Sequence, residues 1–259
     1  MPSEAVLITG ASVGIGRELA RLFAADGCAL ILVSRDQQKL EEAAEESRKL
    51  GASRVQVLPA DLSDTGAAER VFAEATAGGA TVEILVNNAG FGSAGPFWRA
   101  DVEQQLDMIE VNVAALAHLT RLFLPPMIKR GHGRIMNVAS VAGFVAGPLM
   151  ATYYATKAFV ISFSLALNDE CRGTGVTVTA VCPGPTMTEF HIRAKMANSK
   201  LFESSAMTAA EVARIAYRGT MKGKPLVVTG WKNRLMVLGV SLSPRVLAAR
   251  VAGKMNRGR

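Results

Sequence analysis

The stretch Thr9-Gly10-Ala11-Ser12-Val13-Gly14-Ile15-Gly16 decides the fold of this 259-residue chain. It lies between a short apolar run, residues 5–9, and a segment with helical spacing, residues 15–25. Glycines at a strand-to-helix junction let the backbone approach a pyrophosphate, and the start of the helix offers free N–H groups. The spacing is G-x-x-x-G-x-G rather than the common G-x-G-x-x-G, so this motif needs support from the rest of the chain.

Strands and helices alternate beyond this junction. Continuous apolar runs predict buried strands, and apolar residues at helical spacing predict helices. The expected strands are residues 5–9, 29–33, 54–59, 82–86, 134–138, 176–181 and 224–229. The expected helices are residues 15–25, 37–50, 65–77, 102–128 and 152–171. This order predicts an α/β fold with a single doubly wound parallel sheet and helices on both faces.

The composition is that of a globular protein. Hydrophobic residues make up 49% and charged residues 20% of the chain, which excludes a disordered chain, a collagen and a coiled coil. No run approaches the length of a membrane span, and the first residues lack the features of a signal peptide, so we expect a cytoplasmic protein. The cysteines, Cys28, Cys171 and Cys182, match neither metal-ligand nor disulfide spacing and are expected to be reduced thiols.

The net charge of +7 comes from the C-terminal end. Residues 222–259 contain nine basic residues and no acidic one, leaving 20 basic against 22 acidic residues before them. A nucleic-acid-binding protein would carry its basic surface on the folded body, so we expect no nucleic-acid partner. Three uses stay open for the basic apolar tail: peripheral contact with an anionic membrane, packing on a subunit partner, or a cover over the substrate cleft.

The residues after the second expected strand bear on the choice of dinucleotide. An acid at this place hydrogen-bonds the 2′-hydroxyl of an adenosine ribose, whereas an arginine accommodates a 2′-phosphate. The sequence has Ser34-Arg35-Asp36 here. Because a guanidinium suits a phosphate, we expect NADP(H) rather than NAD(H). The alternative is that Arg35 is solvated and Asp36 binds the ribose.

Candidate catalytic residues follow in the second half of the chain. Tyr153 and Lys157 stand at i, i+4 and therefore share one face of an expected helix. A nearby ammonium lowers the pKa of a phenol, which is otherwise about 10. Ser140 follows an expected strand and can donate a hydrogen bond to a carbonyl. Turns at residues 87–90 and 183–188 also follow strands, so we expect all of these groups at one edge of the sheet.

With these motifs the chain resembles the short-chain dehydrogenase/reductase family over residues 5–229. The resemblance rests on four motifs: the glycine motif (Gly10, Gly14, Gly16), Asn88-Ala89-Gly90, the Asn112–Ser140–Tyr153–Lys157 tetrad, and Pro183-Gly184 with Thr188. It implies a Rossmann-like fold, a nicotinamide cofactor and interconversion of a ketone and a secondary alcohol.

The resemblance also implies a role for each member of the tetrad. Tyr153 would be the general acid in ketone reduction, and Ser140 would polarise the carbonyl, so these two are the expected substrate contacts. Lys157 would lower the pKa of the tyrosine and bind the nicotinamide ribose, while Asn112 would hold a water in a proton relay. No metal is implied.

The cofactor would be held along the whole sheet edge. Asp61 would contact the adenine and Thr188 the carboxamide. The full expected set is Gly10, Ser12, Gly14, Ile15, Gly16, Ser34, Arg35, Asp61, Leu62, Asn88, Ala89, Gly90, Tyr153, Lys157, Pro183, Gly184, Thr186 and Thr188.

The substrate and the partners are less constrained. Residues 190–207 fit the family's variable substrate loop, and His191 within it is expected to be an exposed loop residue. An apolar wall would suit a lipid-like 3-oxoacyl, steroid or aromatic ketone. Its candidates, each equally well a core residue, are Phe91, Phe144, Pro148, Met150, Met187 and Phe190.

We expect one catalytic, dinucleotide-binding domain over residues 1–230. The tail, residues 231–259, either belongs to that domain or extends from it. The family implies a homodimer or homotetramer acting on a small ketone or alcohol. One alternative function is a catalytically idle NADP(H)-binding regulatory or scaffold protein, against which the intact tetrad argues. Another is an epimerase or dehydratase, which usually has a longer C-terminal substrate domain.

Overall fold

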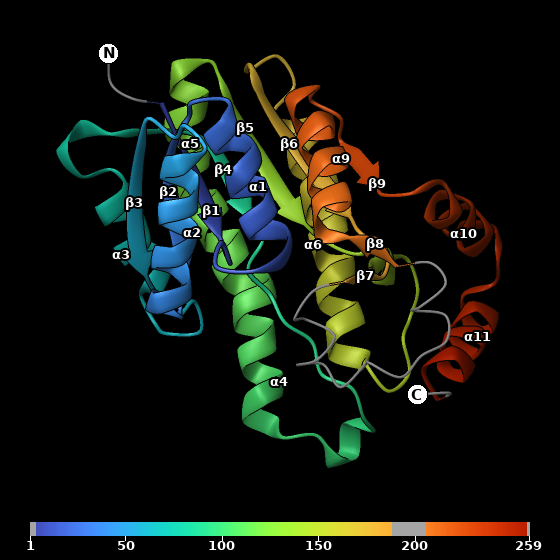
Figure 1. Ribbon diagram of the computed structural model, residues 1–259. Helices are drawn as coiled ribbons and strands as arrows, with labels where there is room; N and C mark the ends of the chain where they lie inside the picture. Colours follow the sequence, from blue (N-terminus) through green and yellow to red (C-terminus); the bar gives the residue numbers. More distant parts are fainter. Residues whose placement is uncertain (1–3, 188–205, 258–259) are drawn as a thin grey trace.

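A computed structural model of the chain describes residues 4–187 and 206–257. Seven parallel strands form the central sheet in the order β3-β2-β1-β4-β5-β6-β9 (Figure 1). Their bounds are β1 Glu4–Thr9, β2 Ala29–Ser34, β3 Arg54–Pro59, β4 Thr81–Asn87, β5 Gly133–Val138, β6 Val176–Cys182 and β9 Leu226–Val228. The order of the strands reverses between β1 and β4, because β2 and β3 lie on one side of β1 and the later strands lie on the other. Open α/β sheets bind ligands at such a point.

Helices cover both faces of the sheet, as the alternation of elements predicts. One face carries α1 (Gly14–Ala25), α2 (Gln37–Lys49) and α9 (Ala209–Met221). The other carries α3 (Ala67–Ala75), α5 (Leu116–Arg130) and α6 (Ala151–Glu170). Successive residues of a strand enter opposite cores, because side chains alternate across a sheet: Leu7 packs in one cluster and Ile8 in the other.

The expected helix at residues 102–128 is one long helix with an irregular middle. It consists of α4 (Val102–Ile109), a π-helical turn (Glu110–Ala115) and α5. In the described part of the chain, this segment alone is long and apolar enough to cross a membrane by length and composition. Here its inner face packs on the sheet, with Leu119, Phe123 and Met127 almost completely buried.

Among the elements of the described residues that were not predicted from the sequence are α9 and two short paired strands, β7 (Thr186–Met187) and β8 (Met207–Thr208). A signal for α9 was available: Thr208 and Glu211 form a capping box, in which each side chain bonds the other's backbone N–H. The expected strand at residues 224–229 is shorter than predicted and spans only Leu226–Val228.

A chain of buried hydrogen bonds ties β4 and β5 to the helices beneath them. The Asn87 amide donates to Thr120 Oγ1 at 3.0 Å and to Asn137 Oδ1 at 2.9 Å, and Asn137 donates to Ser164 Oγ at 2.9 Å. All four side chains are almost fully buried, where such bonds are strong and costly to break. The network therefore holds the ends of β4 and β5 in register with α5 and α6.

The basic tail folds into two helices, α10 (Trp231–Leu242) and α11 (Arg245–Arg257), at one side of the molecule (Figure 1). α10 packs against the short turn Val141–Phe144. α11 lies on the next turn of the chain, because Asn256 Nδ2 donates to the Pro148 carbonyl at 2.9 Å. Both helices therefore lie against the segment that joins Ser140 to α6.

Candidate active site

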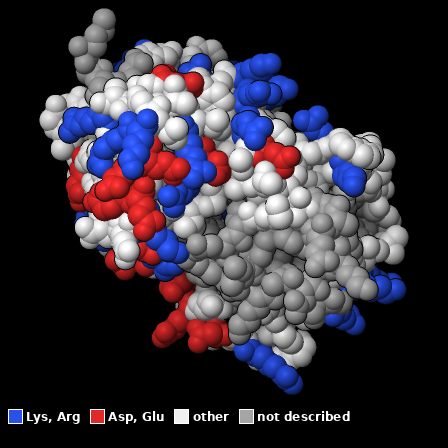
Figure 2. All heavy atoms as spheres, viewed as in Figure 1, with Lys and Arg blue, Asp and Glu red and all other residues white. Residues whose placement is uncertain are grey.

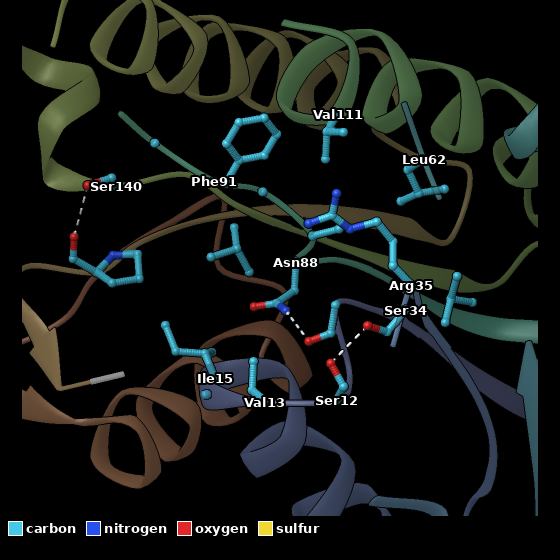
Figure 3. A pocket seen from close by; sticks show the side chains of 18 of the residues that line it. Ser12, Val13, Ile15, Ser34, Arg35, Leu62, Asn88, Phe91, Val111 and Ser140 are labelled. Carbon is cyan, nitrogen blue, oxygen red and sulfur yellow. Dashed lines mark hydrogen bonds between the residues drawn. The ribbon is translucent and has the colours of Figure 1, made fainter. Parts of the chain in front are cut away.

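A cavity of about 240 Å³ opens at the carboxyl ends of the central strands (Figure 3). Expected site residues that line it are Gly10, Ser12, Gly14, Ile15, Ser34, Arg35, Asp61, Leu62, Asn88, Ala89, Gly90, Ser140, Tyr153, Lys157, Pro183 and Thr186. Gly16, Asn112 and Gly184 do not line it. Thr188, Phe190 and His191 lie outside the residues that the structure describes, as does most of the expected substrate loop.

The glycine turn is held against the end of β4. The Thr9 hydroxyl accepts the backbone N–H groups of Asn88 and Ala89, both at 3.0 Å. In return, the Asn88 amide donates to the carbonyls of Thr9 and Gly10 at 2.9 and 3.1 Å. A Cβ on Gly16 would lie 2.3 Å from the Gly10 carbonyl oxygen, so only glycine lets the helix start this close to the turn.

The start of α1 is open to an anion. Val13 precedes the helix and provides no side-chain cap, so the first backbone N–H groups of α1 have no such partner. Gly14, with φ +59°, completes the turn beside the cavity. Uncapped N–H groups and the positive end of the helix dipole fit a pyrophosphate at this position.

A group of hydroxyls and a guanidinium lies at the end of β2. Ser12 Oγ and Ser34 Oγ are 2.8 Å apart, and the Arg35 side chain extends from beside Ser34 toward the side of the cavity where Val111 lies (Figure 3). Arg35 Nη1 donates to Asp61 Oδ2 at 3.3 Å. The alternative, in which Asp36 binds the ribose, is disfavoured. The Asp36 carboxylate caps α2 by accepting the Lys39 N–H at 3.1 Å, and Asp36 does not line the cavity.

Asp61 is held as a carboxylate. Burial alone would raise its pKa, but hydrogen bonds from the backbone and hydroxyl of Ser63, together with Arg35, hold this pKa below its ordinary value. At neutral pH, Asp61 is therefore charged and partly neutralises Arg35.

Ser140 and Tyr153 meet on the opposite side of the cavity. Ser140 Oγ accepts the Ala142 N–H at 3.1 Å and lies 3.4 Å from the Pro183 carbonyl oxygen, and it is hydrogen-bonded to the Tyr153 phenol. Burial raises the pKa of Tyr153 to about 12, although the Ser140 hydrogen bond acts in the opposite direction. The phenol is therefore protonated at neutral pH and available as an acid.

Lys157 lies one helical turn beyond Tyr153 and is almost fully buried. Its Nζ donates to the Val138 carbonyl at 2.8 Å and lies 5.9 Å from the centre of the Tyr153 ring. Burial lowers the pKa of Lys157 to about 8. That Lys157 lowers the pKa of Tyr153 stays a prediction, because burial dominates that pKa in this structure and the ammonium group donates to the Val138 carbonyl.

Asn112 lies in the π-helical turn and holds the loop after β4. Its amide accepts the Phe91 N–H at 3.0 Å and donates to the Phe91 carbonyl at 2.9 Å and to Thr156 Oγ1 at 3.1 Å. A Cβ on Gly90 would lie 2.8 Å from Asn112 Oδ1. The side chain is thus engaged with protein partners, and its role in a proton relay stays a prediction.

The turn after β6 is built around the tail. A Cβ on Gly184 would lie 2.1 Å from Nδ2 of Asn233, which donates to the Thr229 carbonyl. Asn233 is in the first turn of α10, so this glycine gives room to the tail rather than facing the cavity. No signal in the sequence connects these two positions, and the same holds for Thr156 as the partner of Asn112.

Most of the expected apolar wall lies elsewhere. Phe91 lines the cavity, but Phe144, Pro148, Met150 and Met187 do not. Met150 is buried beside Tyr153, Phe144 packs on the core between β6 and α6, and Pro148 lies under α11. Of these residues, Phe144 and Pro148 lie in turns that contact the tail.

The described ranges contain no group of three or more His, Cys, Asp or Glu side chains that could hold a metal ion. The three cysteines are free, and Cys171 and Cys182 are buried.

Comparison with known proteins agrees with this architecture. The family described as short chain dehydrogenase matches residues 4–198. Sulfoacetaldehyde reductase 2 of Chromohalobacter salexigens is 41% identical over 191 residues, which are 73% of this chain and 75% of that protein.

Two solved structures resemble nearly the whole chain. A short-chain dehydrogenase from Sphingobium yanoikuyae in complex with NADPH has a TM-score of 0.82 and 33% identity, covering 92% of this chain and 93% of that one. A structure described under 7β-hydroxysteroid dehydrogenase stereoselectivity has a TM-score of 0.87 and 28% identity, covering 96% of both chains.

The contact between Gly184 and Asn233 predicts a coupled pair of substitutions. Gly184→Ala should lower the free energy of unfolding by about 1–3 kcal/mol, because the new methyl group overlaps the Asn233 amide. In an Asn233→Ala background the same change should cost much less. Urea denaturation of the four proteins measures the coupling. Gly239→Ala, where a Cβ meets nothing within 4 Å, is the control, and strictly additive effects would contradict this account.

Lys157 predicts a pH dependence of stability. Its pKa is about 8 in the folded protein and about 10.5 ordinarily, so the unfolded chain binds more protons between these values. The wild type should therefore gain about 2 kcal/mol over Lys157→Met as the pH rises from about 8 to about 10. Burial raises the pKa of Tyr153 from its ordinary value of 10.0 to about 12, so Tyr153 lowers the free energy of unfolding only as the pH rises above about 10. Denaturation of both proteins across this range tests the sign, and parallel curves would refute it.

Proposed function

This chain belongs to the short chain dehydrogenase family, and from this premise we propose that it interconverts a ketone and a secondary alcohol with NADP(H). It is an oxidoreductase, as its relatives are. The observation that carries the proposal is the convergence of Ser140, Tyr153 and Lys157 at the edge of one cavity whose other end holds the glycine turn. Acid, hydrogen-bond donor and phosphate cradle thus belong to a single site.

The residues present fit a 2′-phosphorylated dinucleotide. The uncapped start of α1 would hold the pyrophosphate, and Ser12, Ser34 and Arg35 would hold the 2′-phosphate. The last residue of β2 is Ser34 and not an acid, so no carboxylate at that position would repel the phosphate. The NADPH complex of the similar Sphingobium yanoikuyae protein supports this choice.

The chemistry assigned to the chain is proton transfer and positioning. When bound, the nicotinamide ring supplies or accepts the hydride. Tyr153 gives its phenolic proton to the carbonyl oxygen during reduction, and Ser140 donates a hydrogen bond that polarises the same oxygen. The ammonium of Lys157 favours the phenolate that remains after transfer, and the buried surroundings strengthen this attraction. Asn112 acts on the site through the Gly90–Phe91 loop that it holds.

The substrate class is a carbonyl compound with an apolar body. Phe91, Val111 and Val138 line the cavity that also contains Ser140 and Tyr153, and mostly apolar pockets with a few polar groups bind small organic molecules. The likeness to a hydroxysteroid dehydrogenase structure supports this class. The alternative, an idle NADP(H)-binding regulatory protein, is disfavoured by the buried Tyr153–Lys157 pair, since a buried ammonium costs stability that mere cofactor binding does not require.

Tyr153→Phe should lower kcat by about 100- to 10,000-fold, because only the general acid is removed. NADPH affinity should change little, as measured by fluorescence titration alongside turnover of a ketone panel. Tyr154→Phe removes the neighbouring hydroxyl and is the matched control, expected to keep its activity. Persistent turnover in Tyr153→Phe would show that another group donates the proton.

Arg35→Glu should lower the preference for NADPH over NADH by about 10- to 100-fold, because a charge-assisted contact with the 2′-phosphate is lost. The ratio of kcat/KM for the two cofactors measures this preference. Arg48→Glu places the same charge change on the exposed face of α2 and should leave the ratio unchanged. An unchanged ratio in Arg35→Glu would exclude a phosphate contact at this residue.

A further inference from the structure

The outer face of α10 carries an exposed apolar stripe. Trp231, Leu235, Leu238 and Leu242 stand at i, i+4, i+7 and i+11, which places them on one side of the helix. They are 67%, 60%, 57% and 80% exposed, so the described part of the protein does not cover them. Large leucine and tryptophan side chains in a continuous exposed row indicate a surface that meets another apolar phase.

The stripe continues along α11. Leu247, Val251 and Met255 stand at i, i+4 and i+8 and are 53%, 51% and 41% exposed. The opposite side of α11 is built of small residues, and there Gly253 and Asn256 rest on Pro148. The helix is therefore docked through its small-residue side, and its large apolar residues point away from the body.

Positive charge flanks this surface, and the tail itself contains no acid. Residues 222–259 contain nine basic residues and no Asp or Glu. Arg250, Lys254 and Arg257 lie beside the α11 stripe, and none is ion-paired with any residue in the described ranges. Figure 2 shows Lys and Arg without acids on the side where α10 and α11 lie, whereas acids and bases mix on the opposite side.

We propose that the outer face of α10 and α11, called here the tail face, binds the surface of an anionic lipid bilayer. The tail face is defined by Trp231, Leu235, Leu238, Leu242, Leu247 and Val251. Amphipathic helices with basic flanks bind in this manner, with apolar residues among the acyl chains and bases at the headgroups. A second copy of the chain fits less well, because pairing two such faces would bring their uncompensated positive charges together.

The position of the tail gives this binding a consequence for catalysis. The inner sides of α10 and α11 lie against residues 141–148, which join Ser140 to the helix that carries Tyr153. A bilayer on the tail face would therefore lie close to the candidate active site. Resting on the proposed function, this geometry points to a ketone dissolved in the membrane as the substrate class.

Vesicle binding tests the proposal directly. The purified full chain is mixed with vesicles of phosphatidylcholine and phosphatidylglycerol in equal parts, or of phosphatidylcholine alone, and sedimented. We expect binding to the anionic vesicles, weakening as salt rises because the Debye length falls to about 8 Å at physiological ionic strength. Absence of binding at low salt, or equal binding to both vesicles, would overturn the proposal.

Two variants separate the charge from the apolar stripe. Arg250→Gln with Lys254→Gln should lower partition by about 25-fold, at about five-fold per base removed near an anionic surface. Leu242→Gln should lower it by about ten-fold or more. The matched controls, on the α2 side of the molecule, are Arg48→Gln with Lys49→Gln, and Leu50→Gln. Loss of binding in the controls as well, or in none of the variants, would refute the tail face as the site.

Two further readouts distinguish the alternatives. In sedimentation equilibrium, Leu242→Gln should have the same oligomeric state as the wild type. If the variant forms a smaller assembly than the wild type, the tail face is a subunit interface instead. The tail variants should keep turnover of a water-soluble ketone while losing any gain from vesicles loaded with an apolar ketone. If the wild type turns over no ketone at all, the proposed function is wrong. Vesicle binding does not depend on turnover, so it tests the membrane proposal separately.

Discussion

The interlock between Thr9 and Asn88 is the contact on which the site depends. The Thr9 hydroxyl accepts two backbone N–H groups from the end of β4, and the Asn88 amide returns two hydrogen bonds to the glycine turn. These hydrogen bonds join the glycine turn to the end of β4, at the point of the sheet where the order of the strands reverses. They also leave no space for a side chain at Gly16, so the first helix must begin directly against the turn. The open N–H groups of that helix, and hence the phosphate site, follow from this spacing.

Burial sets the chemistry at the other end of the cavity. Tyr153 and Lys157 are both removed from water, which favours the neutral form of each and moves their pKa values apart, to about 12 and about 8. The phenol therefore keeps its proton at neutral pH, whereas the neighbouring ammonium loses its proton more readily than an exposed lysine does. The buried Asn87–Asn137–Ser164 chain supports this pair, because it fixes β5 and α6, from which Ser140 and Tyr153 are presented.

The tail is part of the site's construction rather than an appendage. Asn233 occupies the space that Gly184 leaves, and Asn256 holds the Pro148 turn ahead of α6. The buried residues of these helices, Asn233, Ala248, Ala252, Gly253 and Asn256, thus face the body, whereas most of the large apolar residues are exposed. This division of one amphipathic segment into a docking side and an outer side explains how a basic tail can stabilise the active-site turns and still present a free surface.

The alternation of strands and helices, the glycine junction and the Tyr-x-x-x-Lys spacing were determined by the sequence alone, because local periodicity and helical geometry are written within short windows. They led to the doubly wound sheet and to the residues at its edge. Tertiary structure alone decided what depends on distant partners. Gly184 is explained by Asn233, Asn112 is engaged by Phe91 and Thr156, and Phe144, Pro148 and Met150 turned from the expected pocket toward the tail and the core. The direction of the Tyr153 pKa shift belongs to the same class, since burial is a property of the packed molecule and not of the spacing between two residues.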